Sequence, residues 1–400
     1  MRTVLIHTVV VVGLTLTSAE ARAGDFGYGQ APGSPVAVGP MAGRPVIADM
    51  NGDGKPDVVV ACGTCCGSAP SPESGHVAVL ISDGGGRLTL SARSRVKVGP
   101  SVRKVAVGDL NHDGRNDVVA AEHDTYNVTV LLGDGQGGLK AAPGSPIAAA
   151  SGPRAHTHEI ALADVNGDSH LDVLTTNAND NRISVLLGDG KARFAPAAGS
   201  PVETGRHPYD ALAVADVNAD GHVDLVVPLL AAGKIGVLFG DGKGAFAHAP
   251  DSKYVVGPRP GYVAVADVNN DGKPDILATH DDVGLVDVLL NDGSGKFSPA
   301  AGSPRSVSLP AWGISTADLN GDGNVDLALG SFGDGPVVAL GDGKGGFTEV
   351  TGLKLSRASF PNYTAVADLN EDGRPDIVTG NYGSGDVSVF LAAGRTASSK

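Results

Sequence analysis

The amino-acid sequence predicts an all-β fold, a seven-bladed β-propeller with four-stranded blades. Three observations lead to this prediction. A motif of the form Asp-x-Asn-x-Asp-x-x-x-Asp occurs seven times, beginning at Asp49, Asp109, Asp164, Asp216, Asp267, Asp318 and Asp368. The starts are separated by 60, 55, 52, 51, 51 and 50 residues, and a period near 50 is typical of a propeller blade. The 58 glycines and 25 prolines suit many short strands joined by tight turns.

Each repeat carries the pattern of four short strands. An apolar segment such as 105–108 runs into the first aspartate, and the last aspartate of the motif opens a second segment, as in 275–278. A third segment, such as 128–132, ends in a turn of the Gly-Asp-Gly type, and a Phe or Leu then begins the fourth. Strands of this length bounded by turn residues predict one four-stranded blade per repeat.

The two ends of the chain predict how the ring closes. The seventh repeat stops after 387–391 and lacks a fourth strand. Residues 31–35 (Ala-Pro-Gly-Ser-Pro) repeat 142–146, which belong to a fourth strand, and Tyr28 falls where Leu139 does. We therefore expect residues near 26–38 to supply the outer strand of the last blade and to remove an unpaired sheet edge.

The first residues have the pattern of a secretory signal. Arg2 precedes an apolar stretch from Val4 to Leu16, and Ala21-Arg22-Ala23 resembles a cleavage site. We expect a signal peptide at 1–23 that is cleaved after Ala23, a single propeller domain at 24–391 and a short tail at 392–400. The mature chain is expected to be a secreted or periplasmic monomer with no membrane span.

The repeated motif has the ligand chemistry of a calcium loop. Oxygen ligands at positions 1, 3, 5 and 9, completed by the backbone carbonyl of position 7, suit a hard cation. We expect up to seven structural calcium ions. The predicted ligands are Asp49, Asn51, Asp53, Asp57, Asp109, Asn111, Asp113, Asp117, Asp164, Asn166, Asp168, Asp172, Asp216, Asn218, Asp220, Asp224, Asp267, Asn269, Asp271, Asp275, Asp318, Asn320, Asp322, Asp326, Asp368, Asn370, Asp372 and Asp376.

The loop differs from an EF-hand, because Val60 and Ala120 stand where that motif has its twelfth-position Glu. Glycine at position 6 suits a turn with positive φ. The third loop has Ser169 there, so we expect this site to be the weakest.

The net charge of the chain limits the classes of partner that it is expected to bind. The formal net charge is −14, and 21 of the 44 acidic residues lie at the predicted ligand positions. Seven calcium ions would balance that charge, so calcium is expected to stabilise the fold. No cluster of basic residues points to nucleic acid.

The motif and its period resemble the FG-GAP/VCBS repeat family, whose members include the calcium-bearing propeller of integrin α subunits. The resemblance covers roughly residues 24–391. It implies a calcium-binding propeller, often extracellular and often used in adhesion or ligand recognition. This chain differs from integrins in carrying the metal loop in every repeat.

Two insertions are expected on the face opposite the metal loops, where recognition loops of a rigid scaffold would lie. The first holds all three cysteines, Cys62, Cys65 and Cys66. They suggest either a local disulfide involving Cys62 or a copper or zinc site completed by histidines. The second insertion carries His156, His158 and Glu159, and segment 122–124 (Glu-His-Asp) lies on a neighbouring hairpin. These segments are predicted to converge, although solvated loops are the alternative.

A second candidate site is the rim of the central funnel. Residues five to seven positions before each first metal aspartate are expected to point there, including Lys104, Glu159, Asp210 and Asn362. The candidate ligand-binding residues are Arg103, His123, His158, Tyr209, Tyr262, Trp312 and Tyr363. Aromatic and polar groups together suit a sugar or a peptide tail, and packing of the inner strands is the alternative.

Three functions remain open. The first is an extracellular recognition or adhesion module for a carbohydrate or protein ligand. The second is a lyase or hydrolase acting on polysaccharide, using His123, His156, His158 and the His-Asp-Asp segment 280–282. The third is a structural surface protein. No nucleophile elbow, phosphate loop or zinc-protease motif is present.

Overall fold

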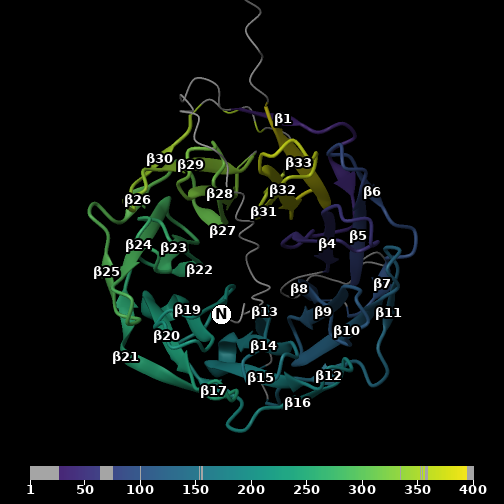
Figure 1. Cartoon of the computed structure of the whole chain (residues 1–400), viewed down its shortest axis with the longest axis horizontal. Coiled ribbons are helices and arrows are strands. Elements are labelled where there is room, and N and C mark those ends of the chain that lie inside the picture. The colour runs from purple at the N-terminus through teal and green to yellow at the C-terminus, as the bar shows by residue number, and fades with distance from the viewer. Residues whose placement is uncertain are drawn as a thin grey trace, which may run out of the picture.

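The computed structural model describes residues 27–63, 75–99, 101–152, 154, 156–333, 335–351, 353, 355 and 359–393. Within these residues, seven antiparallel sheets stand around a central axis as the blades of a propeller (Figure 1). The predicted fold class and blade number are therefore confirmed. The predicted signal segment and tail lie outside the described residues, apart from the start of the tail at 392–393.

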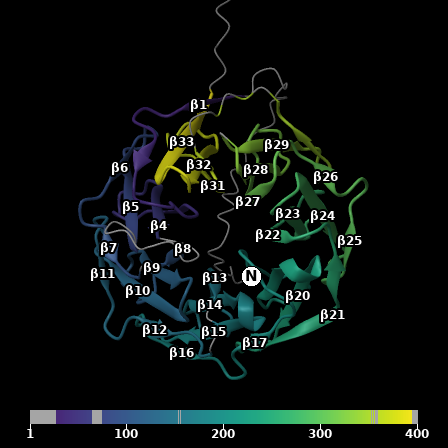
Figure 2. The same cartoon turned by 180° about the vertical axis from the view of Figure 1, so that it is seen from behind.

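The innermost strand of each blade runs along the central axis (Figures 1 and 2). These strands are β3 (Val46–Ala48), β8 (Val102–Gly108), β13 (Thr157–Ala163), β18 (Ala213–Ala215), β22 (Pro260–Ala266), β27 (Ala311–Ala317) and β31 (Tyr363–Ala367). Each ends directly before the first aspartate of a metal loop, as the apolar pattern predicts.

The second strand of each blade begins at the last aspartate of the motif. These strands are β4 (Asp57–Cys62), β9 (Asp117–Glu122), β14 (Asp172–Asn177), β19 (Asp224–Leu229), β23 (Asp275–His280), β28 (Asp326–Ser331) and β32 (Asp376–Asn381). All their residues are buried, because each sheet packs against a neighbouring blade on both faces. This explains continuous apolar runs such as 57–62 in place of alternation.

The third strands pair antiparallel with the second. They are β5 (His76–Ser82), β10 (Asn127–Gly133), β15 (Arg182–Gly188), β20 (Lys234–Gly240), β24 (Leu285–Asn291), β29 (Val337–Gly341) and β33 (Asp386–Ala392). Two 3₁₀ turns, η1 (Ala178–Asp180) and η2 (Leu230–Ala232), join the second and third strands of the third and fourth blades. No helix in the described part of the chain has the length and apolar character to cross a membrane.

The outer strand is divided into two short segments in five of the seven blades, which the sequence pattern did not predict. The pairs are β6 (Leu88–Leu90) with β7 (Val96–Lys97), β11 (Leu139–Ala141) with β12 (Ile147–Ala148), β16 (Phe194–Pro196) with β17 (Val202–Glu203), β25 (Phe297–Pro299) with β26 (Arg305–Ser306), and β1 (Tyr28–Gln30) with β2 (Val36–Ala37). The undivided outer strands are β21 (Phe246–Val255) and β30 (Phe347–Glu349).

The ring closes as the sequence predicts. Strand β1 pairs with β33, with Tyr28 opposite Ala392, and β2 pairs with the other end of β33, with Val36 opposite Val387. Figure 1 shows β1 lying beside β33. The N-terminal segment thus completes the last blade and protects its edge.

The hydrophobic core is divided among the interfaces between blades. One cluster joins Val119 and Val130 of the second blade to Ile160 and Leu186 of the third, and a similar cluster joins the third to the fourth. Valine and leucine dominate these clusters, because β-branched and aliphatic side chains fit between pleated sheets.

Candidate functional site

The seven metal loops have one local structure. In the first loop, Asp49 accepts hydrogen bonds from the backbone N–H groups of Gly52 and Gly54, at 2.7 and 2.8 Å. Asn51 accepts from the N–H of Asp53, and Asp53 accepts from the N–H of Lys55, each at 2.9 Å. The bond from position 6 to the first aspartate recurs in every loop at 2.7 to 2.9 Å. These bonds hold the loop oxygens on one short turn.

Two positions of the loop lie in the left-handed region of the backbone. Position 6 has positive φ in every loop, including +69° at Ser169. Position 4 does so as well, at +58° for His112 and +61° for Ala219. The need at position 6 was predicted from glycine, whereas the need at position 4, which is glycine in only three of the loops, was not predicted. Side chains in this region are strained by about 1–2 kcal/mol.

The ninth-position aspartates are fully buried and link the strands of each blade. Asp117 accepts from the N–H of Leu110 at 3.1 Å and from that of Gly133 at 2.9 Å. Among the described residues, none of the seven takes part in an ion pair. Burial raises the pKa of Asp117 to about 6 and that of Asp326 to about 7. In each residue, two hydrogen bonds from backbone N–H groups lower the pKa, but they offset the effect of burial only in part.

The donor set of these loops fits calcium. Each loop offers three carboxylates and one amide oxygen, and the buried carboxylate lacks a cationic partner within the described chain. Oxygen-only ligands suit a hard cation, and a bound cation would remove the cost of the buried charge. The turns of neighbouring blades close over the loops: the N–H of Gly137 bonds to the carbonyl of Met50 at 3.0 Å, and that of Gly244 bonds to Val165 at 3.1 Å.

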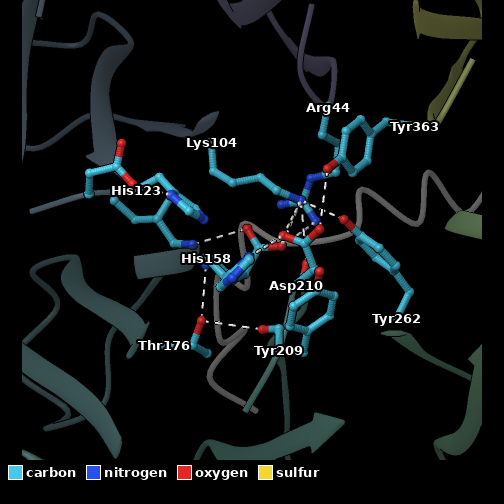
Figure 3. A network of polar contacts seen from close by, with 12 residues as sticks. Arg44, Lys104, His123, His158, Thr176, Tyr209, Asp210, Tyr262 and Tyr363 are labelled. Atoms are coloured by element: carbon cyan, nitrogen blue, oxygen red, sulfur yellow. Dashed lines mark hydrogen bonds and ion pairs between the residues drawn. The ribbon is translucent and has the colours of Figure 1, made fainter. Parts of the chain in front are cut away.

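The opposite end of the inner strands carries a buried polar network (Figure 3). Its centre is Lys104 on β8, only 1% exposed. The Lys104 ammonium lies 3.6 Å from the Glu159 carboxylate and 3.7 Å from that of Asp210. It donates to the Tyr262 hydroxyl at 3.0 Å and lies 4.2 Å from the centre of the Tyr363 ring. The network therefore joins strands of four blades and the segment before β18 across the axis.

A second cation completes this network. The Arg44 guanidinium donates to Glu159 at 3.3 Å. Burial alone would raise the pKa of Asp210, but Lys104 and the hydrogen bond from His158 at 3.1 Å hold that pKa well below its usual value. Paired in this way, the buried Asp210 carboxylate stays ionised. Arg44 was missed in the sequence, although it lies five residues before Asp49, as Lys104 does before Asp109.

Several residues that were predicted to line the rim of the funnel lie in the interior. Tyr262 and Tyr363 are 2% and 1% exposed, so they support the network and do not line an open rim. His158 and His123 are buried as well, whereas Arg103, Tyr209 and Trp312 are half-buried. Beyond the network, a cavity of about 160 Å³ follows the axis, lined largely by aliphatic residues of the inner strands such as Val105, Ile160 and Ile314.

An aromatic cluster lies on the face opposite the predicted metal loops, and the sequence analysis identified only one of its members. The rings of Trp312 and Phe332 meet edge to face at 4.9 Å, and Phe332 lies 6.3 Å from Phe360. Phe332 and Phe360 are 39% and 47% exposed. They lie in the loops joining β28 to β29 and β30 to β31, which the sequence analysis did not single out. The Nε1 of Trp312 and the Oδ1 of Asn362 are buried without a hydrogen-bond partner.

Three histidines from two neighbouring blades converge, as predicted for segments 122–124 and 156–159. The ring centres of His123 and His156 are 4.2 Å apart, and those of His156 and His158 are 4.4 Å apart. Burial, followed by repulsion from neighbouring groups, lowers the pKa of His156 to about 3. Burial also lowers the pKa of His158 to about 4, although its hydrogen bond to Asp210 opposes the shift.

Other predicted contributors lie elsewhere. Cys62 is a free, fully buried thiol on β4, and burial raises its pKa to about 12. The expected disulfide of Cys62 is thus not found, and Cys65 and Cys66 lie outside the described residues. His280 is buried and bonds to Asp287 at 2.8 Å and to the carbonyl of Pro258 at 2.6 Å, so a structural role accounts for it.

Comparison with known proteins agrees with this architecture. The sequence model of the FG-GAP-like repeat matches residues 49–120, 109–175, 164–227, 267–329 and 318–379. The molecule is a β-propeller of seven blades, and the chain belongs to the FG-GAP-like repeat family. A search of curated proteins found no relative by sequence.

Solved structures share the fold at low sequence identity. An Agrocybe aegerita lectin, solved for its specific recognition of non-reducing terminal N-acetylglucosamine, is 22% identical, with 88% of this chain and 85% of the lectin covered and a TM-score of 0.53. Virginiamycin B lyase from Staphylococcus aureus is 13% identical, with 92% of this chain and 98% of the lyase covered and a TM-score of 0.53. Rhamnogalacturonan lyase from Bacillus licheniformis is 12% identical, with 91% of this chain and 75% of the lyase covered and a TM-score of 0.52.

Proposed function

We propose that this protein is an exported, calcium-stabilised propeller that binds carbohydrate on the face opposite its metal loops. The observation that carries the proposal is the exposed aromatic cluster of Trp312, Phe332 and Phe360. Among the described residues, Phe332 and Phe360 are two of the three exposed large hydrophobic side chains, and the third is Val255. Aromatic rings exposed in this way suit the apolar C–H face of a sugar ring.

Polar groups beside the rings suit the sugar hydroxyls. The buried Trp312 Nε1 is a donor without an acceptor, and the buried Asn362 Oδ1 is an acceptor without a donor. The backbone N–H of Gly313, the residue after Trp312, bonds to the carbonyl of Asn362 at 2.8 Å. Trp312 and Asn362 therefore come from adjoining inner strands. Buried polar atoms normally have a partner, and a hydroxyl-rich ligand would supply one. This combination favours a sugar over a purely apolar ligand.

Calcium would act at a distance from this surface. The seven loops lie at the ends of the inner strands remote from the aromatic cluster, and their full sets of oxygen ligands suit a structural role. The secretory pattern at 1–23 would deliver the chain to a compartment where calcium is abundant. Calcium would therefore fix the scaffold while the opposite face supplies the ligand contacts.

Binding to a glycan array in calcium buffer, followed by titration calorimetry, tests this proposal. Because the lectin of the same fold recognises N-acetylglucosamine, amino sugars are the first ligands to examine. Phe332→Ala and Phe360→Ala are each expected to weaken binding about tenfold, the loss of roughly 1.4 kcal/mol of ring contact. Val255→Ala is the matched control, because Val255 is exposed but lies at the end of β21.

Two results would contradict carbohydrate recognition. One is the absence of binding to any glycan on the array. The other is binding that the two phenylalanine variants and the Val255 variant affect equally. A protein ligand captured through Phe332 and Phe360 would keep the surface and change the ligand class.

A further inference from the structure

The three converging histidines form a cluster that carbohydrate recognition does not use. His123 follows β9 directly, and His156 and His158 stand at alternate positions at the start of β13. Main-chain bonds fix these segments: the N–H of Thr157 bonds to the carbonyl of His123 at 3.0 Å, and the N–H of Ala178 bonds to that of His156 at 2.9 Å. The imidazoles are therefore held on rigid backbone, which favours a preorganised site.

Two of the rings present a free nitrogen to the cluster. His123 Nδ1 lies 2.7 Å from Asp124 Oδ1, and His158 Nδ1 lies 3.1 Å from Asp210 Oδ1. A carboxylate accepts a hydrogen bond, so it holds the ring proton on Nδ1 and leaves the lone pair on Nε2. Both Nε2 atoms are buried, and neither has a hydrogen-bond partner among the described residues. Figure 3 shows His123 and His158 close together at the edge of the polar network.

This arrangement is the one that metal-binding histidines adopt. A ligating imidazole usually donates its other N–H to a carboxylate, which fixes the tautomer and raises the basicity of the ligand. Ligand atoms of His123, His156 and His158 all lie within 4.8 Å of one another. A tetrahedral ion with bonds of about 2.1 Å needs ligand nitrogens about 3.4 Å apart, so small side-chain rotations would close the site.

We propose that His123, His156 and His158 bind a divalent transition metal, Zn²⁺ or Cu²⁺, on the face opposite the calcium loops. Imidazole nitrogens suit these ions, whereas Ca²⁺ prefers oxygen ligands. Three protein ligands leave a fourth position for water or a ligand. His156 is only half-buried, so the cluster is not closed to solvent, which suits a fourth ligand.

The surrounding charges allow a cation. Arg103 is the positive group that acts on all three rings, and the carboxylates of Asp124 and Asp210 bond directly to two of them. Within the described chain no other group of three histidine, cysteine or acidic ligands gathers in this way, and Cys62 takes no part. Cys65 and Cys66, which the sequence analysis considered for a mixed cysteine and histidine site, lie outside the described residues.

Titration of the mature chain with Zn²⁺, in enough calcium to saturate the loops, tests the proposal. Calorimetry is expected to give one Zn²⁺ per chain, and Cu²⁺ is expected to give an electron paramagnetic resonance spectrum with imidazole nitrogen coupling. Asp124→Asn is expected to weaken Zn²⁺ binding about 10–100-fold by removing the carboxylate that orients His123. His156→Ala, which removes a direct ligand, is expected to weaken it further and to reduce the nitrogen coupling.

A second histidine pair supplies the matched control. His112 and His170 lie on the metal-loop face with ring nitrogens 2.7 Å apart and exposed. His112→Ala is expected to leave the affinity unchanged. Absence of Zn²⁺ and Cu²⁺ binding, or loss of binding in His112→Ala but not in His156→Ala, would overturn the proposal. Loss of binding in Cys65→Ser would overturn a site made of histidines alone. Glycan binding is measured separately, so either proposal can fail without the other.

Discussion

The two faces of the propeller differ in how closely the seven repeats resemble one another. On one face, the loops beginning at residues 49, 109, 164, 216, 267, 318 and 368 share their predicted ligands, the hydrogen bond from position 6 to the first aspartate and their backbone conformation. On the other face, the histidine cluster belongs to the second and third blades and the aromatic cluster to the sixth and seventh. Repetition favours a task that every blade shares, for which we propose stability, whereas departure from the repeat favours a task of the whole molecule, for which we propose recognition.

Removal of calcium is the change with the largest expected effect on this comparison. At a free concentration 100 times Kd, each independent site adds about 2.7 kcal/mol to the free energy of unfolding. Chelation is therefore expected to lower Tm by more than about 10 °C, as scanning calorimetry would measure. A melting curve unchanged by chelator would contradict the role of the metal-loop face.

Lys104→Met is expected to have the next largest effect, because it leaves Glu159 and Asp210 short of a cation in the interior. Breaking a buried ion pair costs about 3–5 kcal/mol, which urea unfolding at fixed calcium would detect. Lys140→Met is the control, since Lys140 is exposed on β11. Equal stability of the two variants would show that the central network does not hold the inner strands together.

The histidine cluster predicts a pH dependence. Folded His156, with its pKa lowered to about 3, stays neutral, while the unfolded ring takes a proton below about pH 6.5. The unfolded state then binds more protons, so this group makes the fold less stable as pH falls from about 6.5 towards 3. The Tm advantage of the parent over His156→Ala should shrink between pH 7.5 and 4.5 in calcium buffer free of transition metals. A constant difference would contradict the neutral, buried state.

Ser169→Gly is expected to have the smallest effect and to increase stability. Ser169 has a φ of +69° in a loop whose six counterparts are glycines. Relief of left-handed strain is worth about 1 kcal/mol, partly offset by the greater freedom of glycine in the unfolded chain. Urea unfolding would measure the gain, and Ala219→Gly, at +61° in the next loop, offers a second test. Destabilisation of both variants would show that backbone strain is not what distinguishes these loops.

Much of the fold could be predicted because the repeat states it seven times. The ninth-position aspartates open the second strands, and the match of residues 31–35 to 142–146 predicts that β1 completes the blade of β33. The division of the outer strands was missed, because no single residue type marks it: the break between β6 and β7 contains no proline, whereas the undivided β21 contains Pro250. Positive φ at position 4 was missed because residues as different as His112 and Glu371 occupy it.

The opposite face was less predictable because its residues meet only through the closure of the ring. Sequence placed Tyr262 and Tyr363 near the axis by register, but their burial depends on Lys104, contributed by another blade. Convergence of His123 with His156 could be predicted, because the hairpin of the second blade adjoins the insertion before the third blade. Phe332 and Phe360 were missed, although they stand 14 residues after Asp318 and eight before Asp368, the positions that His123 and His156 hold relative to Asp109 and Asp164.

The most direct test of the proposed roles of the two faces measures both Tm and glycan affinity for two variants, one on each face. Asp322→Ala removes a ligand of the sixth metal loop, where Asp322 bonds to Asn320 and Asn324. Phe360→Ala removes an exposed ring from the opposite face. We predict that Asp322→Ala lowers Tm and keeps the affinity of the folded protein, while Phe360→Ala keeps Tm and weakens binding about tenfold. A folded Asp322→Ala variant that no longer binds glycan, or a Phe360→Ala variant that loses stability and retains binding, would contradict the account.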